Sequence, residues 1–477
     1  MSTSKTDTSR ELCLLTATEL AGRIARKEIS SREVTEAHIA QIESINPRVN
    51  AVVTTVFDRA LQQASELDNA GKIIGPLHGL PVLHKDLVPT RGIRTTFGSP
   101  LHANYIPDFD QLIVERMRNA GAITLGKTNT PEFGAGSHTF NQVFGLTRNP
   151  YDPSVSSGGS SGGAAAALAS RMIPLADGSD TGGSLRNPAA FCNVVGFRPS
   201  PGRVPFYPSR NPWSDLSTEG PMARTCEDVA LLFSVLAGPD PRLPGLLETE
   251  GSEFRQMNPV PLENLRIGFT EDFGGLPVEK PIRETLRQFA RDLETAGATV
   301  DEATPNFRDA SRIFHILRAN NFRRFRHLPK NQFDQLKDTI RWNVEAGEAL
   351  TQEDLDWVGP ARTSLIERMN EFFEQFDLLI GPTTQVLPFD ANTEWVQVVD
   401  GVPMSNYIEW MEACSWITVS CCPALSLPAG FFEGLPVGAQ LIAPMRQDAF
   451  LLAAAHAIEA ATGHAHVLPP GSHVISL

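Results

Sequence analysis

The chain has 477 residues, of which 55 are acidic and 41 basic, so its net charge is −14 at pH 7. No basic tail offsets this charge, so we expect no nucleic-acid partner. No run approaches the ~18 apolar residues that a membrane span needs, so we expect no membrane anchor. The remaining class is an ordinary globular protein, which fits 41% hydrophobic and 20% charged residues.

The cysteines and the N-terminus favour a cytoplasmic location. The six cysteines form no C-x-x-C pair, as is typical of a reducing compartment. The opening residues, MSTSKTDTSRELC, lack the apolar core of a signal peptide. The lone pair His464 and His466 has no further ligand nearby, so we expect no metal site.

The first 70 residues predict helices. Thr16 to Glu19 and Ser30 to Glu33 each fit a capping box, which marks a helix start. In the second helix, apolar or buried positions recur at helical spacing at Val34, His38, Ile42 and Ile45. We expect this face to pack against a core, with His38 hydrogen-bonded inside it.

Short apolar strands then alternate with helices up to about residue 240. The strand LPVLH ends at His84, helix Gln111 to Ala120 follows, and AITLG is the next strand. This alternation predicts an α/β fold with a central mixed, mostly parallel β-sheet, covered by helices on both faces. Active sites in such sheets lie at strand ends.

Residues 241–376 read as a peripheral, mostly helical layer, apart from the strand LRIGFT. The chain then returns to core character, with helix Tyr407 to Ser415, strands within 417–427 and 436–442, and a last helix, Ala449 to Thr462. The motifs run from residue 78 to past 430 and must meet at one site. We therefore predict a single large domain over 1–477, built from segments 1–70, 71–240, 241–376 and 377–477.

The stretch from Ser156 to Pro199 carries the strongest chemical signal. It places Ser160 and Ser184 in separate glycine-flanked turns, joined by an Ala-rich helical segment. Glycine lets other backbone or a substrate come close. In DGSDTGGS, successive N–H groups before Ser184 can point into one concavity, which suits an oxyanion. This arrangement predicts a nucleophilic serine.

A nucleophilic serine needs a base, and the tripeptide His84-Lys85-Asp86 offers two. Side chains alternate along a strand, so Lys85 faces one way while His84 and Asp86 face the other. If the latter face the site, the system is Ser-His-Asp-like. If Lys85 faces it, Ser160 becomes a proton bridge, and the lysine pKa must fall from about 10.4 through burial. The residues alone leave both arrangements open.

Two further motifs point elsewhere and are rejected. GAITLGKT, residues 121–128, matches the P-loop pattern, but its middle is strand-like and a proline follows where a helix is required. GSSGG, residues 159–163, would make Ser161 the nucleophile of an α/β-hydrolase, but a polar loop precedes it instead of a buried strand.

The motifs as a set resemble the amidase signature family. The matching residues are the Lys85-Asp86 pair, GGSSGG at 158–163, and GSDTGGSLRNPAAFC at 178–192, with further matches in GKTNTPEF, FGLTRNP, GPMART and PALSLPAGF. The similarity spans nearly the whole chain and implies the fold of that family. His84 stands where the family more often has a small apolar residue.

The resemblance also implies roles for individual residues. Ser184 would be the nucleophile, Ser160 the bridging serine after a cis Gly159-Ser160 bond, and Lys85 the base, with no cofactor. The implied oxyanion hole comprises the N–H groups of Thr181, Gly182, Gly183 and Ser184, supported by Asp180 and Arg186. The implied substrate-binding positions are Gly134, Ala135, Gly136 and Phe144.

The predicted function is hydrolysis of a carboxamide C–N bond through an acyl-enzyme, with water and a small-molecule amide as the reactants. Aromatic side chains could wall an apolar pocket, so we favour a small hydrophobic or aromatic amide, with carbamates or esters as side substrates. Those aromatic residues are Phe133, Phe140, Phe144, Trp213, Trp410 and Trp416. The alternatives are a component of an amidotransferase that works with partners on charged tRNA, a catalytically silent binding protein and, for assembly, a homodimer.

Overall fold

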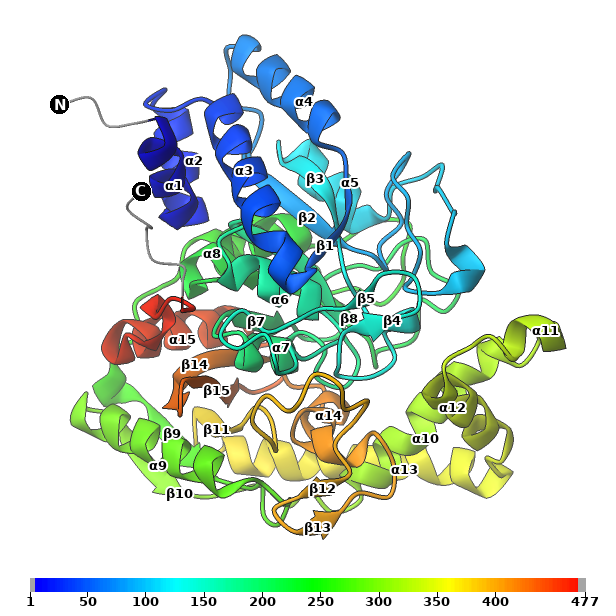
Figure 1. Cartoon of the computed structure of the whole chain (residues 1–477). Helices are drawn as coiled ribbons and strands as arrows, with labels where there is room; N and C mark the ends of the chain where they lie inside the picture. Colours follow the sequence, from blue (N-terminus) through cyan, green and yellow to red (C-terminus); the bar gives the residue numbers. More distant parts are fainter. Residues whose placement is uncertain (1–4, 471–477) are drawn as a thin grey trace.

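A single 11-stranded sheet runs through the molecule, and the computed structural model describes residues 5–470 of the chain. In spatial order the strands are β1 (Val52–Thr55), β3 (Ile123–Thr128), β2 (Pro81–Lys85), β6 (Leu175–Asp180), β8 (Thr218–Ala223), β7 (Val195–Arg198), β14 (Ala424–Phe432), β15 (Leu435–Ile442), β11 (Leu378–Pro382), β9 (Arg266–Phe269) and β10 (Thr299–Glu302) (Figure 1). Two small ribbons, β4 (Phe140–Asn141) with β5 (Gly145–Leu146) and β12 (Val398–Val399) with β13 (Val402–Pro403), lie outside it.

The predicted α/β class and the mixed sheet are confirmed, but the expectation of mostly parallel strands is wrong. Four neighbouring pairs are parallel and six are antiparallel. The parallel pairs lie on either side of an antiparallel centre. There β14 and β15 form a hairpin closed at Glu433 and Gly434, and so tight a turn can only join antiparallel strands.

Fifteen α-helices lie within the described residues. They are α1 (Lys5–Leu14), α2 (Ala17–Ala25), α3 (Ser31–Val49), α4 (Phe57–Asn69), α5 (Leu112–Asn119), α6 (Gly162–Ala169), α7 (Arg186–Phe191), α8 (Cys226–Leu236), α9 (Lys280–Thr295), α10 (Ala310–Phe322), α11 (Lys330–Phe333), α12 (Asp338–Glu348), α13 (Gln352–Phe373), α14 (Glu412–Val419) and α15 (Asp448–Thr462). Both predicted capping boxes, at Thr16 and Ser30, are present.

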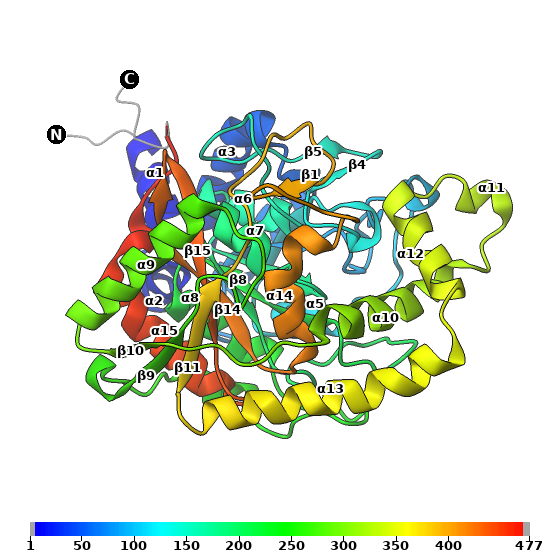
Figure 2. The same cartoon turned by 90° about the horizontal axis from the view of Figure 1, so that it is seen from below.

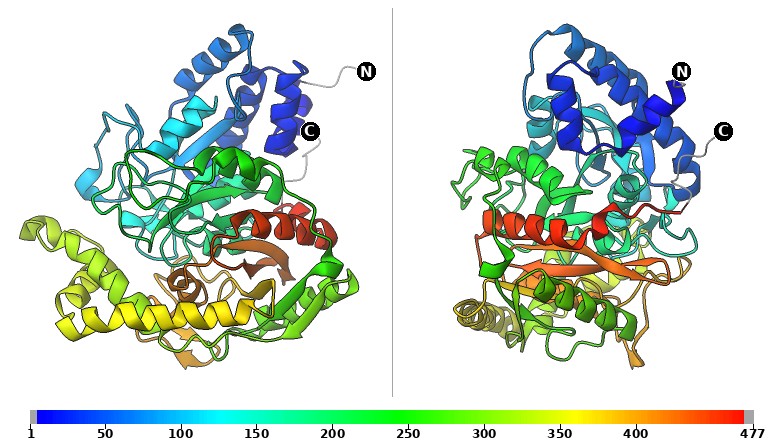
Figure 3. Two further views of the ribbon diagram at one scale, coloured as in Figure 1. Left: turned by 180° about the vertical axis from the view of Figure 1, so that it is seen from behind. Right: turned by 90° about the vertical axis from the view of Figure 1, so that its left-hand side faces the viewer.

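Helices cover both faces of the sheet, as expected. Val82 belongs to the larger hydrophobic core, which includes residues of α2, α8, α9 and α15. Its neighbour Leu83 belongs to a second core, with residues of α3, α4 and α6. Figure 3 shows α15, in red, lying along the orange strands β14 and β15. Successive β2 residues therefore face opposite cores.

Two segments differ from the sequence expectations. α14 begins only at Glu412 and continues to Val419, so the strand expected from Ile417 starts at Ala424. Ile417 and Val419 are fully buried, and this packing outweighs the β preference of branched side chains.

The region 241–376 is mostly helical, and α10 to α13 extend to one side of the molecule (Figure 2). It also supplies β9 and β10, the last two strands at one end of the central sheet. Between residues 5 and 470, no helix combines the length and apolar character needed to cross a bilayer.

Candidate active site

Lys85 ends β2 and is completely buried among serine hydroxyl groups. Its Nζ lies 2.7 Å from Ser160 Oγ, 2.8 Å from Ser161 Oγ and 3.2 Å from Ser179 Oγ. The Gly159-Ser160 peptide bond is cis. The structure thus brings the lysine, rather than His84 or Asp86, to Ser160.

Burial lowers the pKa of Lys85 from 10.5 to about 7, although the charges of Asp180, Asp177 and Glu219 act in the opposite direction. A lysine with such a pKa is substantially uncharged at neutral pH. Its amine can then accept a proton from a neighbouring hydroxyl group.

The two serine turns are adjacent. The Ser161 N–H donates to the Ser184 carbonyl at 3.2 Å, and α6 begins directly afterwards. A Cβ at Gly163 would lie 2.4 Å from Asn129 N, so glycine is required for this close approach. Ser184 itself keeps 9% of its surface exposed.

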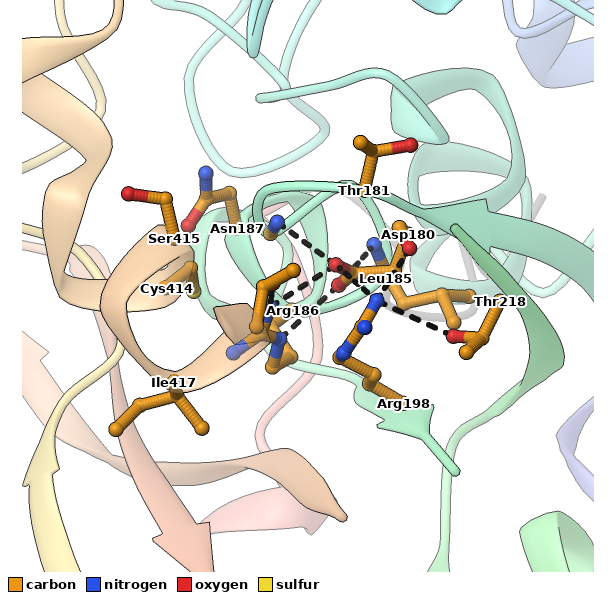
Figure 4. A network of polar contacts seen from close by, with 12 residues as sticks. Asp180, Thr181, Leu185, Arg186, Asn187, Arg198, Thr218, Cys414, Ser415 and Ile417 are labelled. Atoms are coloured by element: carbon orange, nitrogen blue, oxygen red, sulfur yellow. Dashed lines mark hydrogen bonds and ion pairs between the residues drawn. The ribbon is translucent and has the colours of Figure 1, made fainter. Parts of the chain in front are cut away.

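Asp180, at the end of β6, is bonded to the turn that leads into α7 and to Arg186 and Arg198 (Figure 4). Its carboxylate accepts from Gly183 N (2.8 Å), Leu185 N (3.1 Å), and Arg186 Nη2 and Nε (2.9 and 3.0 Å). Arg198 adds a second guanidinium at 3.3 Å. Burial alone would raise the pKa of Asp180, but the two arginines hold it well below its usual range.

This network changes the set of amides available to an oxyanion. The Gly183 N–H is already engaged by Asp180. The hydrogen bonds of residues 5–470 give no acceptor to the N–H groups of Thr181, Gly182 or Ser184. Three of the four expected donors therefore remain available.

The four expected substrate-binding positions separate into two groups. A Cβ at Gly134 would lie 3.4 Å from Ser160 Oγ, and one at Gly136 would lie 3.9 Å from Lys337 Nζ. Ala135, between them, is fully buried. Phe144 instead contacts the Arg94 guanidinium, with its carbonyl held by Asn50.

The six aromatic residues expected to wall a pocket are also scattered. Trp213 is 75% exposed, whereas Trp410 is buried against Phe389. The side chains that reach the nucleophile loop come from elsewhere. Positions for a Cβ at Gly182 and Gly183 lie 2.7 Å from Phe314 Cζ and 2.6 Å from Cys414 Cβ, in α10 and α14.

Several polar groups around Lys85 had no role in the sequence-based prediction. Ser161, considered only as the nucleophile of another fold, and Ser179 both contact its amine. Asp177 accepts the Lys85 backbone N–H at 2.8 Å, and Arg198 shares the role expected of Arg186. A signal was present, because LADGSD carries two carboxylates in an otherwise apolar strand.

The structure agrees with the rejection of the P-loop interpretation. GAITLGKT contains β3, and Lys127 is buried there, 2.9 Å from Thr90 Oγ1.

All six cysteines are free. Within the described part of the chain, no group of three or more His, Cys, Asp or Glu side chains could hold a metal ion.

The site combines a buried amine, two serine turns and a row of backbone donors. Comparison with known proteins identifies the family of the chain. The family model described as Amidase matches residues 33–452. The chain therefore belongs to the amidase family.

The relatives include both amidotransferase subunits and amide-hydrolysing enzymes. The chain is 34% identical to the A subunit of glutamyl-tRNA(Gln) amidotransferase from Pseudomonas aeruginosa, over 93% of this chain and 96% of that protein. It is similar to the structure of a bacterial aryl acylamidase of the amidase signature family, with a TM-score of 0.88, 32% identity, and coverage of 96% and 98%. For the same amidotransferase component from Thermotoga maritima the TM-score is 0.74, with 25% identity and 98% of both chains covered.

Proposed function

We propose that this amidase is a serine hydrolase that uses a Ser-Ser-Lys relay on a small hydrophobic or aromatic amide. The observation that carries the proposal is the buried Lys85 amine, which lies 2.7 Å from Ser160 Oγ. Because serine hydroxyls are weak nucleophiles at neutral pH, such a base is what the reaction needs.

In the proposed mechanism the neutral Lys85 takes a proton from Ser160, which takes one from Ser184. Ser184 Oγ attacks the amide carbonyl, and the resulting oxyanion accepts hydrogen bonds from Thr181, Gly182 and Ser184 N–H. The proton returns through the relay to the leaving amine, and the C–N bond breaks. Water then repeats the sequence on the acyl-enzyme and frees the acid.

The preference for aromatic or apolar groups is supported by Phe314 and Cys414, which lie against Gly182 and Gly183, the glycines before Ser184. Apolar walls with few polar groups favour uncharged substrates. Carbamates and esters present the same carbonyl and are expected as side substrates.

A component of an amidotransferase is the second candidate, because the curated relatives at 34% identity carry that activity. Such a component would release ammonia from glutamine for a partner. The higher TM-score with the aryl acylamidase, 0.88 against 0.74, favours the stand-alone hydrolase.

The test uses the purified full chain with p-nitroacetanilide, a neutral aryl ester, a carbamate and glutamine. We expect hydrolysis of the anilide, and labelling of Ser184 by a fluorophosphonate. Ser184→Ala should abolish both, while Ser156→Ala, which removes a buried serine bonded to His138, should leave the labelling site intact. Activity on glutamine alone would favour the amidotransferase, and labelling of Ser161 would overturn the relay.

A further inference from the structure

A polar layer lies directly behind Lys85, on the other side of β2. Lys85 lies on the same face of β2 as Leu83, which packs in the core that contains α6. His84 lies on the opposite face, together with Val82 and the larger core. His84 is 1% exposed and Asp177 is fully buried. The charge of the Asp177 carboxylate raises the pKa of the Lys85 amine, because a nearby negative charge stabilises the charged form of an amine.

His84 and Asp177 form a closed pair. His84 Nδ1 contacts Asp177 Oδ2, and its Nε2 lies 3.2 Å from Thr124 Oγ1. The second carboxylate oxygen, Oδ1, accepts the Lys85 backbone N–H at 2.8 Å. Within residues 5–470, His84 is the only ion-pair partner of Asp177. In this contact Nδ1 is the donor, because a carboxylate oxygen only accepts.

Three carboxyl groups act on the Lys85 amine, namely those of Asp180, Asp177 and Glu219. Asp180 is compensated by Arg186 and Arg198. A group that compensates either of the other two would therefore favour the neutral amine further.

Glu219 is neutralised in a different way. It is 3% exposed and bonded to Gln111 Nε2, and its Oε2 has no hydrogen-bond partner among the described residues. A buried carboxylate with an unpaired oxygen is costly, so the proton-bound acid is favoured. Burial, together with the charge of Asp177, raises the pKa of Glu219 to about 8.

We propose that His84 is a positioning residue which compensates the Asp177 carboxylate and thereby keeps the Lys85 amine uncharged. The inference rests on the proposed function, in which Lys85 is the base. His84 reaches neither serine in this arrangement and acts only through Asp177. Lys127 on β3, the register partner of His84, also interacts with Asp177, but its Nζ donates to Val88 O and Thr90 Oγ1.

The test is the pH dependence of Ser184 labelling by a fluorophosphonate, measured as a second-order rate constant from about pH 5 to about pH 9. This readout needs no knowledge of the substrate. In His84→Gln the Asp177 charge is uncompensated, so the rising limb should move up by about one pH unit or more. In Asp177→Asn it should move down, and the double variant should return toward the wild-type midpoint.

His38→Gln is the matched control, since His38 is also a fully buried histidine but lies in α3. It should leave the midpoint unchanged. A His84→Gln midpoint equal to that of the wild type would overturn the inference and leave His84 a packing residue. If His84→Gln does not fold, Asp177→Asn decides, because an unchanged or raised midpoint there would overturn the inference equally.

The proposed function fails in a different way. If Lys85→Ala is labelled as fast as the wild type, or if the wild type has no rising limb, the relay itself is wrong. A limb that disappears in Lys85→Ala but does not move in the His84 and Asp177 variants overturns the positioning role alone.

Discussion

The polar core around Ser184 and the helical wall beside it are held by different kinds of interaction. In the core, Asp180 alone engages two amides and two guanidinium groups, and every member is buried. The wall, from α10 and α14, meets the Ser184 loop through apolar contacts of Phe314 and Cys414. Directional bonds and charges tolerate little change, whereas apolar contacts can be exchanged. Reaction and substrate choice are therefore expected to be separable in this protein.

The largest effect is expected in the core, from Lys85→Ala. Loss of the base should lower kcat/KM on p-nitroacetanilide by about 10²–10⁴-fold. Lys127→Met is the matched control, since Lys127 is equally buried on the adjacent β3. If both variants folded and lost activity equally, Lys85 would have no special role compared with Lys127, and the prediction would be contradicted.

Asp180→Asn tests the structural side of the core. It leaves Arg186 and Arg198 as buried cations without a carboxylate, so we expect a loss of about 3–5 kcal/mol in the free energy of unfolding. Urea denaturation measures it. Asp334→Asn, which removes an exposed pair with Lys330 at 2.7 Å, should change stability little. A small loss of unfolding free energy in Asp180→Asn would mean that the Ser184 loop is stable without the Asp180 carboxylate.

The pH dependence should follow Lys85. Because the neutral amine is the active form in the proposed relay and burial lowers the lysine pKa to about 7, kcat/KM should fall about tenfold per pH unit below that value and level off above it. A stopped assay from about pH 5 to about pH 9 measures this limb. A flat profile would contradict the relay.

The smallest effect is expected in the wall, from Phe314→Leu. It opens space beside Gly182 without touching the polar core, so kcat/KM should shift a few-fold between small and bulky anilides. Phe289→Leu, in α9, is a fully buried control that should not alter this ratio. A uniform loss on all substrates would mean that Phe314 supports the loop instead of selecting substrates.

The fold class and the set of residues able to do chemistry follow from local patterns in the chain. Glycines around Ser160 and before Ser184 indicate tight turns, and at Gly163 an added Cβ would lie 2.4 Å from Asn129 N, which only glycine avoids. The strand LPVLH and the capping boxes at Thr16 and Ser30 are also local, and they appear where they were expected.

Which face of β2 meets the serines depends on tertiary packing, because alternation along a strand fixes that the faces differ but not where each one points. The same packing brings Phe314 from α10 and places Asp177 beside Lys85, whereas the bond from Gly183 N–H to Asp180 is local, three residues apart. Two of these contacts, Lys85 with Asp177 and Gly182 with Phe314, join residues 92 or more positions apart. Long-range packing sets them, and no local pattern records it.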